Sequence, residues 1–435
     1  MNDEALDQLV AEIRRQWGDR LPVPRRDEST DERDLREEMT RDILERVVIP
    51  EWERERLHAR VAPLDHHERC SLVDMVISGI FGLPRLLTVL RDPDVTDVLV
   101  FGADPVRVER RDGTIQLLAP LVRRDRDLER IIYETATSRR RPFNRESPFV
   151  DLELEPGVRF HGEGFDVVQR PLIAVRRAAA QGLSLAELAA GRTLDDGAVE
   201  LLRAAVAAEL NVLVCGRMGS GKTTLLRALV GEVHSRAVIV TVETDFELNI
   251  AGLGTHRFVH AYQARVPGTV DGVGISCHDV MVPALRTRAD WIVVGEVRGA
   301  EGGALVQAMS IGQGAMATVH GGSAKDGLER LAELIAAHNR VEIPMARWQV
   351  YRSVDLVVHV DGDNVTGRYV TEIAAPSTED DGARCIVHRL FRPQQGAPDR
   401  RGRPASEPQH AMLERLRSAC PDFSTHWWFS GRVVA

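Results

Sequence analysis

The stretch GRMGSGKTT, residues 216–224, has residue types and spacing suited to holding the phosphates of a nucleotide. It fits the pattern G-x-x-x-x-G-K-[ST], in which the glycines let backbone N–H groups curl around phosphate oxygens. Lys222 supplies a compact positive charge between the β and γ oxygens, and the Thr223 hydroxyl can reach Mg²⁺. The residues expected to surround the nucleotide are Gly216, Arg217, Met218, Gly219, Ser220, Gly221, Lys222, Thr223 and Thr224.

The choice of lysine in this stretch supports the interpretation. The chain carries 56 Lys+Arg, but only two of these residues are lysines, Lys222 and Lys325. A planar guanidinium would not fit where a compact ammonium can lie between phosphate oxygens. A lysine at this position therefore favours ATP and Mg²⁺ as cofactors over a glycine-rich turn that binds nothing.

Hydrolysis needs a carboxylate near the metal and a group that orients the attacking water. Glu296 ends the apolar run WIVVGEV, where ligands gather in open α/β sheets, and is the expected Walker B acid. The stretch VTVETDFEL offers three crowded acids within five residues, Glu243, Asp245 and Glu247, of which Glu243 is expected in the outer shell of the metal. His320 closes the run AMATVH and is a candidate sensor of the γ-phosphate, with a purely structural role as the alternative.

Alternating strands and helices are predicted to position these residues. The loop follows the apolar run NVLVC and precedes TTLLRALVGEV, which has helical spacing, so the order is strand, loop and helix. Further apolar runs at 237–243, 291–297, 315–320 and 355–360 alternate with helical stretches, which indicates a parallel sheet covered by helices. The fold class is therefore α/β, a RecA-like P-loop NTPase domain with a mostly parallel sheet, preceded by a smaller α+β N-terminal domain.

The chain is predicted to divide into four segments. Charge-dense residues with apolar side chains at helical spacing indicate an N-terminal helical extension, which could dock a partner or pack on the body. Its apolar positions are Leu6, Leu9, Val10, Ile13 and Trp17, then Leu35, Met39, Ile43 and Val47. The segments are the extension at 1–65, the α+β domain at 66–180, the ATPase domain at 181–375 and a partly disordered C-terminal extension at 376–435, where Trp427 and Trp428 are read as packing residues.

Composition narrows the classes of protein. The 435 residues carry a formal net charge of -9, which is no footprint of a nucleic-acid binder. Five cysteines without C-x-x-C spacing argue against a structural zinc site or a disulfide framework. The acidic N-terminus is unlike a signal peptide and the longest apolar run is too short for a membrane span, so a membrane role is expected to act through a partner.

Four signatures in order resemble the type II/IV secretion and pilus-assembly ATPases, in particular the CpaF-like branch of Tad pilus systems. They are GRMGSGKTT for Walker A, VTVETDFEL for the Asp box, ALRTRADWIVVGEVRG for Walker B and GAMATVHGGSA for the His box. The resemblance covers roughly residues 72 to 375. It implies that Glu247 polarises the attacking water, that Glu296 and His320 fill the Walker B and His-box positions, and that Arg159 and Arg176 fold over the γ-phosphate.

The resemblance also implies a function and partners. It implies an ATP-hydrolysing cytoplasmic motor, a homo-hexamer peripherally associated with the inner face of the cell membrane through platform proteins of a pilus or secretion system. Three departures from the family pattern concern affinity and turnover rather than fold: Thr244 follows Glu243 where the family has Asp, Arg217 and Met218 interrupt the usual loop, and PGVRFH replaces DGSRVN.

Other functions remain as alternatives. A conjugative secretion ATPase or a RecA-type nucleic-acid translocase would use the same loop, although the acidic balance disfavours stable nucleic-acid binding. A non-enzymatic assembly scaffold is a further alternative because of the Thr244 departure. A GTPase is disfavoured because the chain has no [NT]-K-x-D motif, and a transporter subunit because no L-S-G-G-Q stretch follows the loop.

Overall fold

The computed structural model describes residues 12–13, 15–23, 30–58, 64–155, 157–177, 182–265, 274–363, 367–379, 384–397, 399–426 and 428. The chain divides into two compact units, Met1–Ala178 with Gly268–Gly272, and Ala179–Pro267 with Val273–Ala435. Among the described residues, no helix combines the length and apolar character that crossing a membrane requires.

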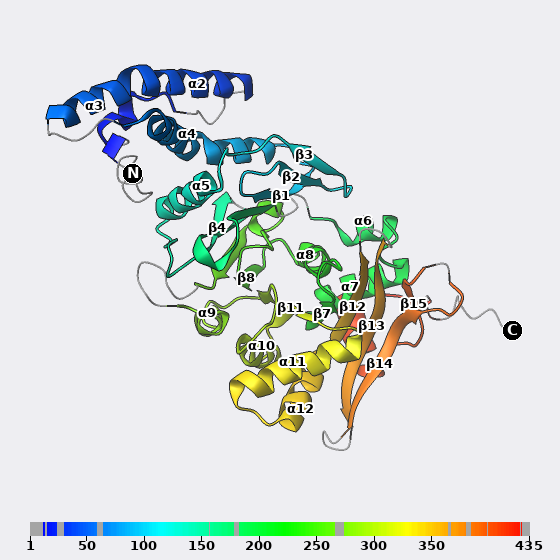
Figure 1. Cartoon of the computed structure of the whole chain (residues 1–435). Helices are drawn as coiled ribbons and strands as arrows, with labels where there is room; N and C mark the ends of the chain where they lie inside the picture. The colour runs from blue at the N-terminus through cyan, green and yellow to red at the C-terminus, as the bar shows by residue number, and fades with distance from the viewer. Residues whose placement is uncertain are drawn as a thin grey trace. The chain divides into compact units, whose positions relative to one another are not determined.

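The first unit is built on a six-stranded antiparallel sheet with the order β3-β2-β1-β6-β5-β4 (Figure 1). Helix α5 covers one face of the sheet because its residues Leu128, Ile131 and Ile132 are buried against strand residues such as Val98 and Phe160. The elements are β1 Val95–Phe101, β2 Val106–Arg110, β3 Ile115–Leu118, α5 Asp125–Ser138, β4 Phe149–Glu155, β5 Val158–Glu163, η3 Phe165–Val167 and β6 Leu172–Arg177. This unit is the smaller α+β domain that the sequence predicts.

Helices precede this sheet and enclose a core of their own. They are η1 Gly18–Arg20, α2 Thr30–Ile43, η2 Leu44–Val48, α3 Ile49–His58 and α4 His66–Val89. Ile13 and Trp17 are buried with Leu44 and Trp52, so these side chains pack on the unit itself. Leu35, Met39 and Val47 are exposed instead, because α2 turns its Thr40 and Glu37 face inward. Leu6, Leu9 and Val10 lie outside the described residues.

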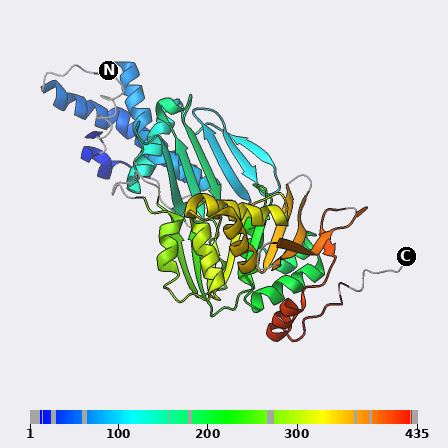
Figure 2. The same cartoon turned by 90° about the horizontal axis from the view of Figure 1, so that it is seen from below.

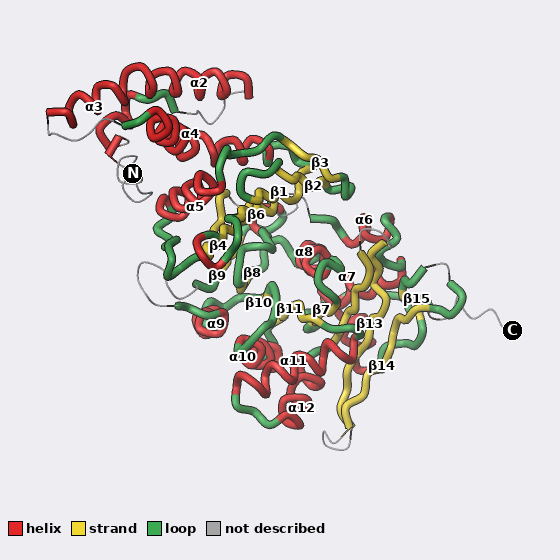
Figure 3. The backbone as a smooth tube through the Cα atoms, in the orientation of Figure 1, coloured by secondary structure: helices red, strands yellow, loops and turns green. Residues whose placement is uncertain are grey.

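The second unit contains a nine-stranded sheet with the order β15-β14-β13-β12-β7-β11-β10-β8-β9. The six strands from β12 to β9 are parallel, and β13, β14 and β15 add antiparallel strands at one side. Figure 3 shows β13 and β14 as long yellow tubes. The strands are β7 Val212–Gly216, β8 Val238–Glu243, β9 Phe258–Gln263, β10 Trp291–Val294, β11 Gly314–His320, β12 Leu356–Asp363, β13 Gly367–Glu379, β14 Arg384–Pro393 and β15 Gly402–Pro404. The predicted RecA-like α/β domain with a mostly parallel sheet is confirmed.

Helices cover both faces of this sheet, as Figure 2 shows. Successive strand residues point to opposite faces, so Val212 and Val214 join one core and Leu213 and Cys215 the other. The helical elements are α6 Leu185–Ala190, α7 Asp196–Ala207, α8 Lys222–Gly231, η4 Ala251–Leu253, α9 Cys277–Ala284, α10 Glu301–Ser310, α11 Ala324–Asn339, α12 Ile343–Ser353 and α13 His410–Ala419. Strands buried on both faces read as continuous apolar runs, which is why the sequence reveals them.

Within the extension that was expected to be partly disordered, residues 384–393 and 402–404 form β14 and β15, and residues 410–419 form the helix α13. The segment is polar, but Leu390 and Phe391 are fully buried. Trp428 packs edge-on against Phe391 at 5.6 Å between ring centroids and donates its indole N–H to the Leu390 carbonyl. Sparse apolar residues in a polar segment gave too weak a pattern to predict these strands. Trp427 lies outside the described residues.

Candidate nucleotide-binding site

The glycine-rich loop joins the end of β7 to the start of α8, as the sequence predicts. Gly219 and Gly221 have φ of 75° and 100°, a left-handed conformation that side chains with a Cβ rarely adopt. A Cβ on Gly216 would lie 2.2 Å from the Val360 carbonyl oxygen, because β12 pairs with β7 beside the loop. The three glycines are therefore required by the backbone itself.

Lys222 is the first residue of α8, and its side chain is folded back under the loop. Its Nζ donates to the Gly216 and Arg217 carbonyl oxygens at 3.1 and 2.8 Å, and lies 3.3 Å from Nδ1 of His320. Burial lowers the pKa of Lys222, and the charge of Glu296 partly opposes this effect. The ammonium is therefore desolvated and held among oxygen acceptors, which is the setting in which it would hold a phosphate.

Lys222, His320, Glu296 and Arg298 form a continuous chain of contacts across three strand ends. The Nε2 of His320, at the end of β11, lies 2.6 Å from Oε1 of Glu296, which follows β10. Arg298 donates from Nε and Nη2 to Oε2 of Glu296 at 2.9 and 2.5 Å, and this carboxylate raises the pKa of Arg298. The structure thus brings together three of the residues that the sequence predicts as catalytic.

Glu301, which the sequence analysis missed, fixes the loop that carries Arg298. Its Oε1 accepts hydrogen bonds from the backbone N–H groups of Arg298 and Gly299 at 2.6 and 2.8 Å. Glu301 is the first residue of α10 and is buried. A carboxylate that accepts from backbone N–H groups at a helix start is favoured by the helix dipole as well. Its spacing five residues after Glu296 was the only available signal in the sequence.

Glu243, which the sequence analysis expects in the outer shell of a metal, is buried at the end of β8. Its Oε2 accepts from the N–H groups of Glu247 and Leu248 at 2.8 and 2.7 Å, and its Oε1 accepts from the Thr241 hydroxyl at 3.0 Å. Burial raises the pKa of Glu243, while these hydrogen bonds oppose the rise. These contacts show that Glu243 holds the turn after β8, because a buried carboxylate must find hydrogen-bond partners nearby. Its place in the outer shell of a metal stays a prediction.

Glu247 and Asp245 occupy that turn and are only partly buried. Both carboxylates help to raise the pKa of Arg298, and the charge of Glu247 also acts on Lys222. Asp245 additionally accepts a long contact of 3.5 Å from Nε2 of Gln263 on β9. The turn therefore places both carboxylates where their charges act on Arg298.

The remaining loop residues are compatible with a site that binds a nucleotide together with Mg²⁺. Thr223 and Thr224 lie in the first turn of α8, Met218 is 84% exposed, and Ser220 is buried. Among the described residues there is no group of three or more His, Cys, Asp or Glu side chains placed to hold a metal. Mg²⁺ keeps several waters and takes its other ligands from one or two protein groups and the substrate phosphates, so the Thr223 hydroxyl and Glu296 fit it.

Arg368, a second residue that the sequence analysis missed, contacts the loop from β13. Its Nε donates to the Gly219 carbonyl oxygen at 3.1 Å, and its Cδ would lie 3.3 Å from a Cβ built on Gly221. The peptide that links Gly219 to Ser220 is planar, so a donor on its carbonyl also fixes the direction of the Ser220 N–H. Arg368 thereby constrains the anion-binding part of the loop.

Arg159 and Arg176 belong to the first unit, where they lie side by side. They are direct cross-strand partners on β5 and β6, and the next positions in the same row are Glu153 on β4 and Asp97 on β1. Arg176 lies 3.8 Å from Asp97 and its side chain is 70% exposed. The register therefore brings two expected γ-phosphate residues together, with acids at either side.

Comparisons with known proteins agree with these features. Residues 158–366 match the family model described as type II/IV secretion system protein. A protein of Mycobacterium tuberculosis (strain H37Rv) named as a conjugal transfer protein is 33% identical over 288 residues, which are 64% of this chain and 80% of the relative. The conjugal transfer protein TrbB of Rhizobium radiobacter is 28% identical over 233 residues, covering 52% of this chain and 68% of the relative.

A solved structure, the ATPase DotB of Legionella pneumophila, is similar with a TM-score of 0.44 and 18% identity, covering 71% of this chain and 79% of that one. The assignment to a family rests on the sequence matches and not on this structural similarity. With 33% identity across 80% of the mycobacterial relative and a family model that spans the glycine-rich loop, the chain belongs to the family of type II/IV secretion system proteins.

Proposed function

We propose that this chain hydrolyses ATP to ADP and phosphate and uses the reaction to drive a secretion or pilus-assembly machine. The contact chain from Lys222 through His320 to Glu296 is the observation that carries the proposal. This contact chain joins the glycine-rich loop to the ends of β10 and β11. A change at the γ-phosphate would therefore alter contacts at the ends of three strands of one sheet, β7, β10 and β11. A site that bound nucleotide without hydrolysing it would not need this linkage between Lys222, His320 and Glu296.

The proposed roles follow from the contacts. Lys222 and the loop N–H groups bind the phosphates, and the Thr223 hydroxyl and Glu296 hold Mg²⁺, which neutralises the charge that develops on the phosphates. Glu247 orients the attacking water, with Asp245 as the alternative on the same turn. His320 is placed to respond to the γ-phosphate because it lies between Lys222 and Glu296. Arg159 and Arg176 are proposed to complete the site by stabilising the γ-phosphate.

We further propose that the protein works as a homo-hexamer at the inner face of the cell membrane, held there by platform proteins. In this proposal the arginines of one subunit act on the nucleotide that the loop of a neighbouring subunit holds. A ring of subunits offers this arrangement at every site. A CpaF-like place in a Tad pilus system stays a proposal that rests on the four signatures. The named relatives favour a second candidate, a conjugative secretion ATPase.

The substitution Lys222→Arg tests the proposal, with Lys325→Arg as a matched control at the only other lysine, which is exposed in α11. If Lys222 is a fitted point charge, Lys222→Arg should lower steady-state ATP turnover by about 10² or more, while Lys325→Arg keeps turnover within about twofold. Most of the activity surviving in Lys222→Arg would contradict the proposed loop chemistry.

The same assay with and without single-stranded DNA separates a secretion or pilus motor from a nucleic-acid translocase. A secretion or pilus motor without stable nucleic-acid binding should show turnover unchanged by DNA. Stimulation by DNA that weakens steeply with added salt would instead favour a nucleic-acid translocase, because phosphate contacts release counterions.

A further inference from the structure

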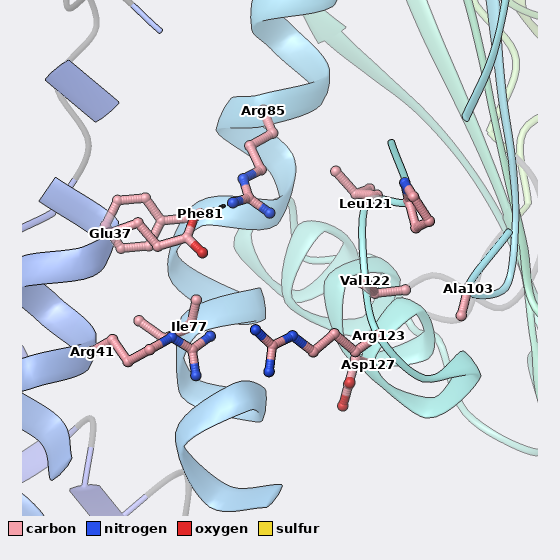
Figure 4. Close-up of a pocket in the computed structure, with 11 residues that line it drawn as sticks. Glu37, Arg41, Ile77, Phe81, Arg85, Ala103, Leu121, Val122, Arg123 and Asp127 are labelled. Carbon is pink, nitrogen blue, oxygen red and sulfur yellow. Dashed lines mark ion pairs between the residues drawn. The ribbon is translucent and has the colours of Figure 1, made fainter. Parts of the chain in front are cut away.

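The cavity that Figure 4 shows in the first unit is accounted for by contacts within that unit. Its volume is about 410 Å³, and its walls come from α2, from α4 and from the segment that leads into α5. Arg85 pairs with Glu37 at 2.6 Å between Nη2 and Oε2, and Arg41, Arg123 and Asp127 have interaction partners as well. The contacts that extend the proposed function lie in the second unit instead, around the loop that follows β10.

The loop that follows β10 carries Glu296 and Arg298, and Glu301 accepts hydrogen bonds from two of its backbone N–H groups. Because Glu296 is proposed to hold Mg²⁺, the direction in which its side chain leaves the backbone depends on how firmly this loop is held. The carbonyl group at the end of the loop, that of Ala300, is held from two other helices.

Two side chains from different helices donate to the Ala300 carbonyl oxygen. Nδ1 of His278, in the first turn of α9, lies 3.2 Å from this oxygen, and Nδ2 of Asn339, the last residue of α11, lies 3.0 Å from it. A carbonyl oxygen only accepts, so both nitrogens donate their protons. Both side chains are half-buried, and a hydrogen bond is stronger in such a partly desolvated place than in water.

Gly303 makes the approach of Asn339 possible. A Cβ built on Gly303 would lie 2.8 Å from both Cγ and Nδ2 of Asn339, which is closer than real Cβ atoms come to other heavy atoms. Gly303 lies in the first turn of α10 and its φ is not left-handed, so alanine would suit the helix better. The space that this glycine leaves therefore serves the contact between Asn339 and Ala300.

We propose that His278 and Asn339 are positioning residues of the ATPase site, which hold the Ala300 carbonyl and through it the loop that presents Glu296 and Arg298. The inference rests on the proposed function, because the loop affects turnover only if Glu296 takes part in hydrolysis. Charged groups that act in a reaction are effective when the backbone that carries them is already in place. In this role His278 and Asn339 act through the loop and do not touch the nucleotide.

Steady-state turnover and calorimetric ADP binding by the full chain separate a positioning role from nucleotide binding. His278→Ala and Asn339→Ala should each lower kcat by about threefold to tenfold, while KM for ATP and the affinity for ADP stay within about twofold. His278→Asn, which keeps an N–H donor, should restore most of the loss. His338→Ala is the matched control, since His338 is the exposed neighbour of Asn339 in α11.

Gly303→Ala gives an independent route to the same loss. Alanine ordinarily favours a helix, but here its Cβ would push Asn339 off the Ala300 carbonyl, so kcat should fall as in Asn339→Ala. The double variant Gly303→Ala with Asn339→Ala should be no worse than Asn339→Ala alone, because the clash needs the Asn339 side chain. Gly231→Ala, at a helical glycine where a Cβ meets no atom within 4 Å, is the control.

Amide hydrogen exchange across residues 296–303 tests the contacts of His278 and Asn339 without relying on hydrolysis. His278→Ala, Asn339→Ala and Gly303→Ala should each speed exchange there by about threefold to tenfold, with an unchanged fold by circular dichroism. A wild-type chain without ATP turnover would contradict the proposed function itself. Unchanged exchange in these variants, or faster exchange in variants that keep full kcat, would overturn the positioning role.

Discussion

Lys222 illustrates how a single residue links the loop to the rest of the site. Its ammonium lies on the loop's own carbonyl oxygens and beside His320, whose other nitrogen is 2.6 Å from Glu296. A phosphate that enters the loop competes for the same ammonium protons. Binding must therefore redistribute the contacts of Lys222, and His320 and Glu296 are the groups placed to respond.

The three acids after β8 have separable roles. Glu247→Gln should keep ATP bound but lower turnover by about 10²–10⁴, because general-base positioning is lost. Glu243→Gln should lower both turnover and stability, the latter by about 1–3 kcal/mol, because the turn loses an acceptor of two backbone N–H groups. Asp245→Asn should be nearly silent. Nucleotide binding and turnover measured on all three decide the assignment, which shifts to Asp245 if only Asp245→Asn is inactive.

Arg368 is expected to act on nucleotide affinity more than on chemistry. Arg368→Gln removes the donor to the Gly219 carbonyl and should raise KM for ATP by about threefold to tenfold with kcat nearly unchanged. Arg384→Gln on β14 serves as the control, because Arg384 is exposed and makes no contact with the glycine-rich loop among the described residues. A fall in kcat at constant KM would contradict a positioning role.

At the scale of elements, the antiparallel strands β13 to β15 extend the parallel sheet and support the loop. Val360 of β12 packs its carbonyl against Gly216, and β13 carries Arg368 over the loop. The helix α13 and Trp428 close the apolar face of these strands, with Leu390, Phe391 and Leu416 fully buried. The C-terminal part is therefore structural support for the nucleotide site rather than an independent tail.

Trp428→Ala should destabilise the second unit by about 3–5 kcal/mol, because a buried aromatic side chain and its hydrogen bond are both lost. Trp348→Ala is the matched control, since Trp348 is only partly buried and stacks under Arg352. Thermal unfolding followed by circular dichroism measures the difference. Equal melting temperatures for both variants would show that the C-terminal elements do not support the unit.

At the scale of the molecule, the proposed homo-hexamer can be tested directly. The glycine-rich loop belongs to the second unit, and the paired Arg159 and Arg176, which are proposed to stabilise the γ-phosphate, belong to the first. If the protein works as the proposed homo-hexamer, light scattering at tens of micromolar protein with an ATP analogue and Mg²⁺ should show a ring of six. Arg159→Gln with Arg176→Gln should reduce turnover more than nucleotide binding. A strictly monomeric protein under these conditions would count heavily against the motor.

The sequence alone determined the loop, the alternation of parallel strands with helices, the place of Lys222 in the loop motif and the strand-end positions of Glu296 and His320. These features are local: a glycine pattern between a strand and a helix, and apolar runs whose ends carry polar residues. Strands of a parallel sheet end at one edge, so residues far apart in the chain could be assigned to one site before the fold was known.

Only the tertiary structure decided the contacts of Arg368, Glu301 and Glu243 and the strands after residue 383. Arg368 and Gly219 are 149 residues apart, and no pattern in the chain encodes a contact between a side chain and a backbone carbonyl at that separation. The sequence analysis places Glu243 in the outer shell of the metal, which stays a prediction. The buried partners of Glu243, two backbone N–H groups and a hydroxyl, are set by how the turn folds back on β8.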